Sequence, residues 1–130
     1  MEISVFADAS EIGAAAAADG AALIQSAIAA RGQANVILAT GVSQFEMIDA
    51  LIAKGGIDWS KVTAFHLDEY IGLPLSHPAS FRRYLKERFA GRAEGLGAFH
   101  YIDGEADDPE AEARRLGEVI GAHPIDVAFI

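Results

Sequence analysis

The chain has 130 residues, 52% of them hydrophobic and 22% charged, with a formal net charge of −9 and no cysteine. This composition predicts one domain with a packed core. It disfavours disorder and a general affinity for nucleic acid or anionic membranes, both of which reward clustered Lys and Arg.

The chain is predicted to open with a short strand, over residues 3–6, and a long Ala-rich helix. Asp8 and Glu11 stand at capping-box spacing before this helix, which runs to about Arg31, where Gly32 ends it. Apolar residues recur at helical spacing and predict the helix face that packs on a sheet: Ile12, Ala16, Leu23, Ala27 and Ile28.

Two continuous apolar runs, residues 34–39 and 62–67, predict buried strands. Neither run has the polar alternation of a half-exposed strand, which suits strands of a parallel sheet covered by helices on both faces. A helix over residues 44–53 is predicted to connect them.

The second half of the chain continues this alternation of helices and strands. His77-Pro78 is predicted to open a helix with proline at an early position. Its apolar stripe, interpreted as core, consists of Phe81, Tyr84, Leu85 and Phe89. An extended segment over 99–102 then leads to a helix from Asp108-Pro109 through residue 120, and residues 125–130 are predicted to form a fourth buried strand.

These elements predict an α/β fold with a doubly wound, mostly parallel, Rossmann-like sheet and helices on both faces. The fourth strand ends at Ile130, where a loop at the carboxyl end of the sheet would be expected to follow. We therefore expect residues 1–130 to be the N-terminal half of a larger catalytic domain. The alternative is a small domain whose last strand lies near an edge.

Several classes of site and location are disfavoured. The absence of cysteine excludes disulfides and thiolate chemistry, and the four histidines lack the paired spacing of zinc sites, so we expect no metal. The N-terminus has no basic segment, and no apolar stretch is expected to reach the ~18 residues that span a bilayer. We expect a soluble, cytoplasmic protein without membrane or nucleic-acid partners.

The first candidate site is the loop Thr40, Gly41, Val42 and Ser43, between a predicted strand and a predicted helix. Two hydroxyls, a glycine that allows close approach, and free amides at a helix start are what a phosphate monoester needs. The alternative is an ordinary turn with Ser43 as N-cap, because short Gly/Ser motifs often occur without a ligand.

The second candidate site is the pair Asp68 and Glu69, at the carboxyl end of a predicted strand, where ligands bind in open α/β sheets. In extended geometry neighbouring side chains point to opposite sides, so one of the two should face a given pocket, and we choose Asp68. At a partly dry pocket mouth the pKa of such a carboxylate would be raised toward that of a useful base. The alternative is a pair of solvated loop residues.

Other polar residues are left out of the site. His66 is interpreted as a hydrogen-bonded core histidine. Five cations of one predicted helix and its end are interpreted as a solvated face: Arg82, Arg83, Lys86, Arg88 and Arg92.

The combined motif resembles the signature of glucosamine-6-phosphate deaminases, also called isomerases, which are related to 6-phosphogluconolactonases. It consists of residues 65–74 (Phe-His-Leu-Asp-Glu-Tyr-Ile-Gly-Leu-Pro) and 77–81 (His-Pro-Ala-Ser-Phe). The resemblance runs from about Asp8 to Ile130. Residues 40–44 align with that family's phosphate loop, in which Val42 and Gln44 here replace a glycine and a proline.

The resemblance implies a catalytic role for Asp68, with Glu69 beside it, and phosphate binding by residues 40–43. Asp68 would move a proton between C2 and C1 of the open-chain amino sugar, which then loses ammonia to give fructose 6-phosphate. It also implies a small phosphosugar substrate, no cofactor and a homo-oligomeric full-length parent. Other family residues lie beyond the strand matching 125–130, so little turnover is expected from these 130 residues alone.

Two other functions remain open from the sequence. A 6-phosphogluconolactonase would hydrolyse a lactone and typically has Arg at the position of Tyr70, so Tyr70 favours the deaminase. A phosphosugar-sensing domain of the same fold would bind without converting its ligand.

Overall fold

The computed structural model describes residues 3–130, so Met1 and Glu2 lie outside the described residues. Four short strands form one parallel sheet in the order β3-β2-β1-β4. The strands are β1 (Ala34–Leu38), β2 (Val62–His66), β3 (Ala98–His100) and β4 (Val127–Phe129). Four α-helices accompany them: α1 (Ala9–Arg31), α2 (Phe45–Lys54), α3 (Phe81–Leu85) and α4 (Pro109–Gly121). The predicted α/β fold with a parallel sheet is therefore confirmed.

Three shorter helical turns complete the chain. Two of them, η1 (Val42–Gln44) and η2 (Trp59–Lys61), are 3-10 turns that lead into α2 and β2. The third, η3 (Lys86–Ala90), is a π-helical turn that extends α3. The stripe that begins at Phe81 therefore spans two kinds of helix, with Leu85 and Phe89 buried as predicted.

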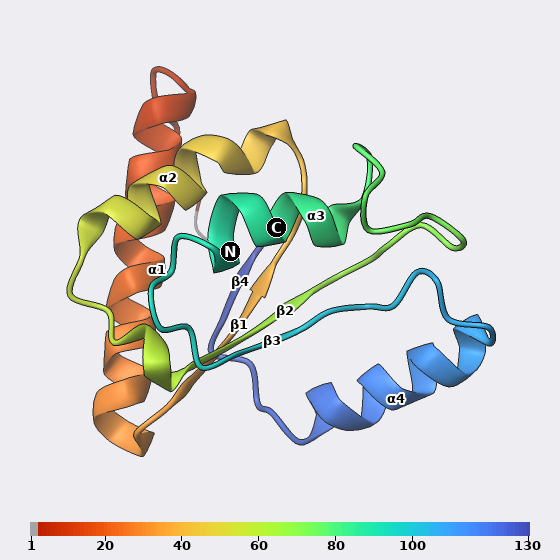
Figure 1. Ribbon diagram of the computed structural model, residues 1–130. Helices are drawn as coiled ribbons and strands as arrows, with labels where there is room; N and C mark the ends of the chain where they lie inside the picture. The colour runs from red at the N-terminus through yellow and green to blue at the C-terminus, as the bar shows by residue number, and fades with distance from the viewer. Residues whose placement is uncertain (1–2) are drawn as a thin grey trace.

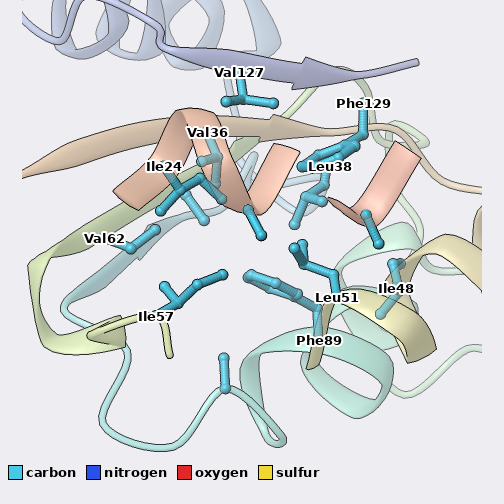
Figure 2. Packing of buried hydrophobic residues seen from close by; sticks show 14 of the residues in the cluster. Ile24, Val36, Leu38, Ile48, Leu51, Ile57, Val62, Phe89, Val127 and Phe129 are labelled. Carbon is cyan, nitrogen blue, oxygen red and sulfur yellow. The ribbon is translucent and has the colours of Figure 1, made fainter. Parts of the chain in front are cut away.

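One face of the sheet carries the hydrophobic core. Alternate residues of three neighbouring strands point to it: Val36, Leu38, Val62, Ala64, Val127 and Phe129. α1, α2 and the α3–η3 segment cover this face, as Figure 2 shows for Ile24, Leu51 and Phe89. The continuous apolar runs form strands because both of their faces lie against other parts of the chain.

The opposite face is covered less completely. α4 lies on this side of the sheet, away from α1 and α2 (Figure 1), and Phe65 of β2 points toward it. Ala128 occupies the same face of β4 and is exposed. Helices therefore lie on both faces, but α4 covers only the β2–β3 end.

The boundaries of α1 are as predicted, whereas its buried face is predicted only in part: Ala27 is buried, and Ala16 and Ile28 pack against the core. The Asp8 carboxylate accepts from the Glu11 N–H at 2.9 Å, and Gly32 ends the helix in the left-handed conformation. Ile12 and Leu23 are exposed, and the buried stripe consists of Gly13, Ala17, Gly20, Ala21, Ile24 and Ala27. Small residues face inward because α2 and Phe129 approach the helix axis closely: a Cβ on Gly20 would lie 2.2 Å from the Phe129 ring.

By length and composition α1 is also long and apolar enough to cross a membrane. The expectation that no apolar stretch reaches this length was therefore wrong, because the alanines of α1 give a long helix of high hydropathy. Its buried stripe and its packing on the sheet identify it as a core helix of this domain.

Two further predictions are corrected. Residues 3–6 form no strand and are exposed, because no neighbouring strand supplies backbone partners for them. The helix predicted to open at His77-Pro78 begins at Phe81. Residues 77–80 form a turn, and the Ser80 hydroxyl caps the helix by accepting from the Arg83 N–H at 3.2 Å.

Candidate functional site at the carboxyl edge of the sheet

The order β3-β2-β1-β4 places a topological switch point at β1, where the chain changes the direction in which it adds strands. Open α/β sheets bind ligands in the crevice at the carboxyl ends of the strands beside such a point. Leu38 of β1 pairs with His66 of β2, and Thr40 and Asp68 each follow this pair by two residues. Both candidate sites therefore leave the sheet at the same edge.

The loop after β1 presents polar backbone to this edge. Gly41 has φ +141°, a value that favours glycine, and both Val42 and Ser43 are exposed. Within residues 3–130, the N–H groups of Val42 and Ser43 donate to no protein acceptor. Free amides that lead through η1 into α2 are the donors that a phosphate group accepts from.

Asp68 and Glu69 lie in different environments, and it is Glu69 that lines the larger hollow. Asp68 is exposed, and it lines neither of the two hollows found near the loops. Neither of these hollows forms the partly dry pocket mouth expected around Asp68, and the chain has a bend at Leu67, just before it. Glu69 has a side chain that is 0% exposed.

The buried Glu69 carboxylate is saturated with donors. It accepts from the N–H groups of Tyr70, Phe81 and Arg82 at 2.9, 3.2 and 2.8 Å, and from the Ser80 hydroxyl at 2.9 Å. Burial raises the pKa of Glu69, but these hydrogen bonds outweigh burial and hold its pKa below the usual value. A charged group held in this way anchors a loop and has little freedom to exchange protons with a substrate.

Arg82 joins the loops that follow β2 and β3. Its Nε lies 3.4 Å from Glu69, and its other nitrogens donate to Asp103, Glu105 and the Leu73 carbonyl at 2.8–3.0 Å. Interpreting Arg82 as part of a solvated helix face was therefore wrong. No single-sequence pattern marked it, since the ion pairs come from residues 13–23 positions away.

His66 is the hydrogen-bonded core residue that the sequence predicted. Its Nε2 accepts from the Ile102 N–H at 2.9 Å, and burial lowers its pKa while the nearby Glu69 and Asp68 charges oppose this. The imidazole is therefore neutral near pH 7, and it helps to join β2 to the segment after β3.

Two hollows lie near the loops. The larger, of about 370 Å³, lies between the β2 and β3 ends and α4 and is mostly apolar. The smaller, of about 210 Å³, is lined by Gly41 and Val42 of the phosphate loop together with Tyr70, Ser80 and Tyr84. Only the smaller one touches the predicted phosphate loop. Among the described residues, no group of three or more His, Asp and Glu side chains is arranged to hold a metal ion.

The fold and this edge define an open parallel α/β domain with a glycine loop and an acid beside its switch point. The family described as glucosamine-6-phosphate isomerases/6-phosphogluconolactonase matches residues 7–129. The chain therefore belongs to this family, as the resemblance of its motifs implied.

Known proteins of both kinds named in that description are similar to the chain. A glucosamine-6-phosphate deaminase of Listeria monocytogenes is 37% identical over 100 residues, which cover 76% of this chain and 42% of the relative. A monomeric glucosamine-6-phosphate deaminase of known structure has a TM-score of 0.82 at 26% identity over 94% of this chain and 51% of its own. A 6-phosphogluconolactonase from Shewanella baltica has a TM-score of 0.83 at 26% identity over 95% and 53%. The chain thus spans about half the length of these relatives.

Proposed function

We propose that this chain contributes the phosphate loop and the proton-transferring acid of a glucosamine-6-phosphate deaminase. The reaction is the isomerisation and deamination of glucosamine 6-phosphate to fructose 6-phosphate and ammonia, a step of amino-sugar catabolism. One observation carries this proposal: Thr40–Ser43 and Asp68 leave adjacent strands at the same edge, in a chain whose curated relatives are named as deaminases.

Each group has a definite role in the proposed chemistry. The loop 40–43 binds the phosphate through its amides and hydroxyls. The Asp68 carboxylate takes the proton from C2 of the open-chain sugar and returns it to C1. One water then adds at C2 as ammonia leaves, so the atoms balance. Asp68 is the candidate base because its side chain is exposed, whereas Glu69 is fully engaged by its donors.

Asp68→Asn tests this role. We expect glucosamine 6-phosphate, and not glucosamine, to bind the wild-type chain, and deuterium from the solvent to enter the bound sugar at C1 or C2. Asp68→Asn should leave binding within about threefold and reduce exchange by roughly 10²–10⁴, the usual contribution of a general base. Asp107→Asn, at another exposed acid, is the matched control. Equal exchange in both variants would remove Asp68 from the mechanism.

A lactonase is the second candidate, because the Shewanella baltica 6-phosphogluconolactonase is as similar in structure as the deaminase. Parallel assays of ammonia release and lactone hydrolysis by the full-length parent separate the two. Lactone hydrolysis without ammonia release would favour the lactonase over the deaminase. If the full-length protein binds the sugar phosphate but catalyses neither reaction, a sensor is favoured.

A further inference from the structure

Tyr84 of α3 contacts the predicted phosphate loop directly. Its hydroxyl donates to the Gly41 carbonyl at 3.0 Å, and the same carbonyl accepts from the Gln44 N–H at 3.1 Å. The first bond crosses between segments 43 residues apart, whereas the second is local to η1. The hydroxyl is therefore the link between the loop and the α3 segment.

Side-chain packing also holds this hydroxyl in position. The Tyr84 ring stacks on the Phe45 ring with centroids 5.8 Å apart. The Arg88 guanidinium lies 3.4 Å from the centre of the Phe45 ring. Burial also raises the pKa of Tyr84, so the hydroxyl keeps its proton near pH 7 and remains a donor.

The bond determines how the next amide is presented. In a trans peptide the C=O and N–H point in opposite directions, so holding the Gly41 carbonyl on Tyr84 turns the Val42 N–H away from α3. Gly41, at φ +141°, has no side chain to restrict this peptide. We infer that Tyr84 is a positioning residue, whose hydroxyl orients the Gly41–Val42 peptide so that the Val42 N–H donates to the substrate phosphate.

This inference rests on the proposed function and predicts an effect different from that of a merely structural contact. Without the hydroxyl, the Gly41 carbonyl keeps its bond from Gln44, so η1 and α2 remain folded. The Gly41 carbonyl then accepts one hydrogen bond instead of two, and part of the ligand's binding free energy is used to order the loop. Phosphate affinity should therefore fall more than stability does.

The test is Tyr84→Phe, which deletes the hydroxyl and keeps the stacked ring, against Tyr101→Phe. Within the described residues Tyr101 is half-buried and its hydroxyl makes no hydrogen bond. Titrations with inorganic phosphate and with glucosamine 6-phosphate would follow the Val42 and Ser43 amides by ¹⁵N NMR. We expect Tyr84→Phe to raise both Kd values about 3- to 10-fold, the usual worth of one hydrogen bond, and Tyr101→Phe to leave them unchanged.

The other outcomes separate the two proposals. Unchanged Kd values in Tyr84→Phe would overturn the positioning role and leave the proposed function standing. Wild-type protein that shows no phosphate-dependent shifts at these two amides would overturn both. Loss of spectral dispersion in Tyr84→Phe, or an equal loss of affinity for unphosphorylated glucosamine, would also overturn the inference.

Discussion

At the scale of single residues, the two adjacent acids at the end of β2 (Val62–His66) have different physical roles. Asp68 is exposed, whereas Glu69 has no exposed side-chain surface and accepts from four donors. A buried charge without its partners is costly, so the donors around Glu69 form a unit that holds the loop against α3. Glu69 thereby keeps Asp68 and Tyr70, its two neighbours, in fixed positions at the sheet edge.

Glu69→Gln tests this anchoring role. The amide cannot accept from all of these donors, and it places its own N–H₂ group among them. We expect the free energy of unfolding to fall by about 2–3 kcal/mol. Glu87→Gln is the control, because Glu87 makes only an exposed pair with Arg83 among residues 3–130, and it should change the free energy of unfolding by less than about 0.5 kcal/mol. Equal small effects in denaturant titrations of both variants would contradict the anchoring role.

The anchoring role of Glu69 should also make the stability of the chain depend on pH. Hydrogen bonds hold the pKa of Glu69 below its ordinary value of 4.5 in the folded chain. The folded state therefore binds this proton less readily than the unfolded state. The contribution of Glu69 is complete above pH 4.5 and is lost as the pH falls through the folded pKa. We expect the stability difference between wild type and Glu69→Gln to shrink below about pH 4.5, and a difference independent of pH would be contrary to this account.

At the scale of elements, α1 packs through small residues. Gly13 lies where a Cβ would come 2.6 Å from the Glu46 Cβ and 2.8 Å from the Met47 nitrogen of α2. This contact involves backbone, so neither helix can relieve it by turning a side chain. The close approach of α1 to α2 thus depends on glycine.

Gly13→Ala should therefore lower the stability of the chain, whereas a Gly→Ala substitution inside a helix usually raises it. Alanine normally stabilises a helix interior by about 0.5–1 kcal/mol relative to glycine. At Gly13 the overlap should instead destabilise the chain by about 1–3 kcal/mol. Gly117→Ala in α4, where a Cβ would meet nothing within 4 Å, should show the usual gain. Thermal melts in which both variants shift the Tm in the same direction would contradict the packing described.

Element boundaries set by local chemistry could be predicted from the sequence, and those set by distant partners could not. The cap at Asp8, the end at Gly32 and the buried runs of β1 and β2 are properties of neighbouring residues. The inward face of α1 depends instead on where α2 and Phe129 lie, so Leu23 was wrongly expected to be buried. Residues 3–6 have strand composition but no neighbouring strand to pair with.

At the scale of the whole molecule, the strand order brings separate motifs together. The loop 40–43 and Asp68 are candidate sites from the sequence, and the parallel pairing of β1 with β2 puts both at one edge of the sheet, as expected of successive parallel strands. The anchoring by Arg82 follows from contacts to Asp103 and Glu105, which no local spacing predicts. The larger of the two hollows lies beneath α4 and is lined by Glu69, but not by residues 40–43 or Asp68, and it has no part in the proposed reaction.

The most direct measurement is a crystal structure of the chain with bound glucosamine 6-phosphate. We predict the phosphate oxygens about 3 Å from the Val42 and Ser43 amides, and an Asp68 carboxylate oxygen within about 3–3.5 Å of C2 of the sugar. A sugar bound in the hollow beneath α4, or an Asp68 carboxylate turned into bulk water beside a correctly bound phosphate, would contradict the central claim.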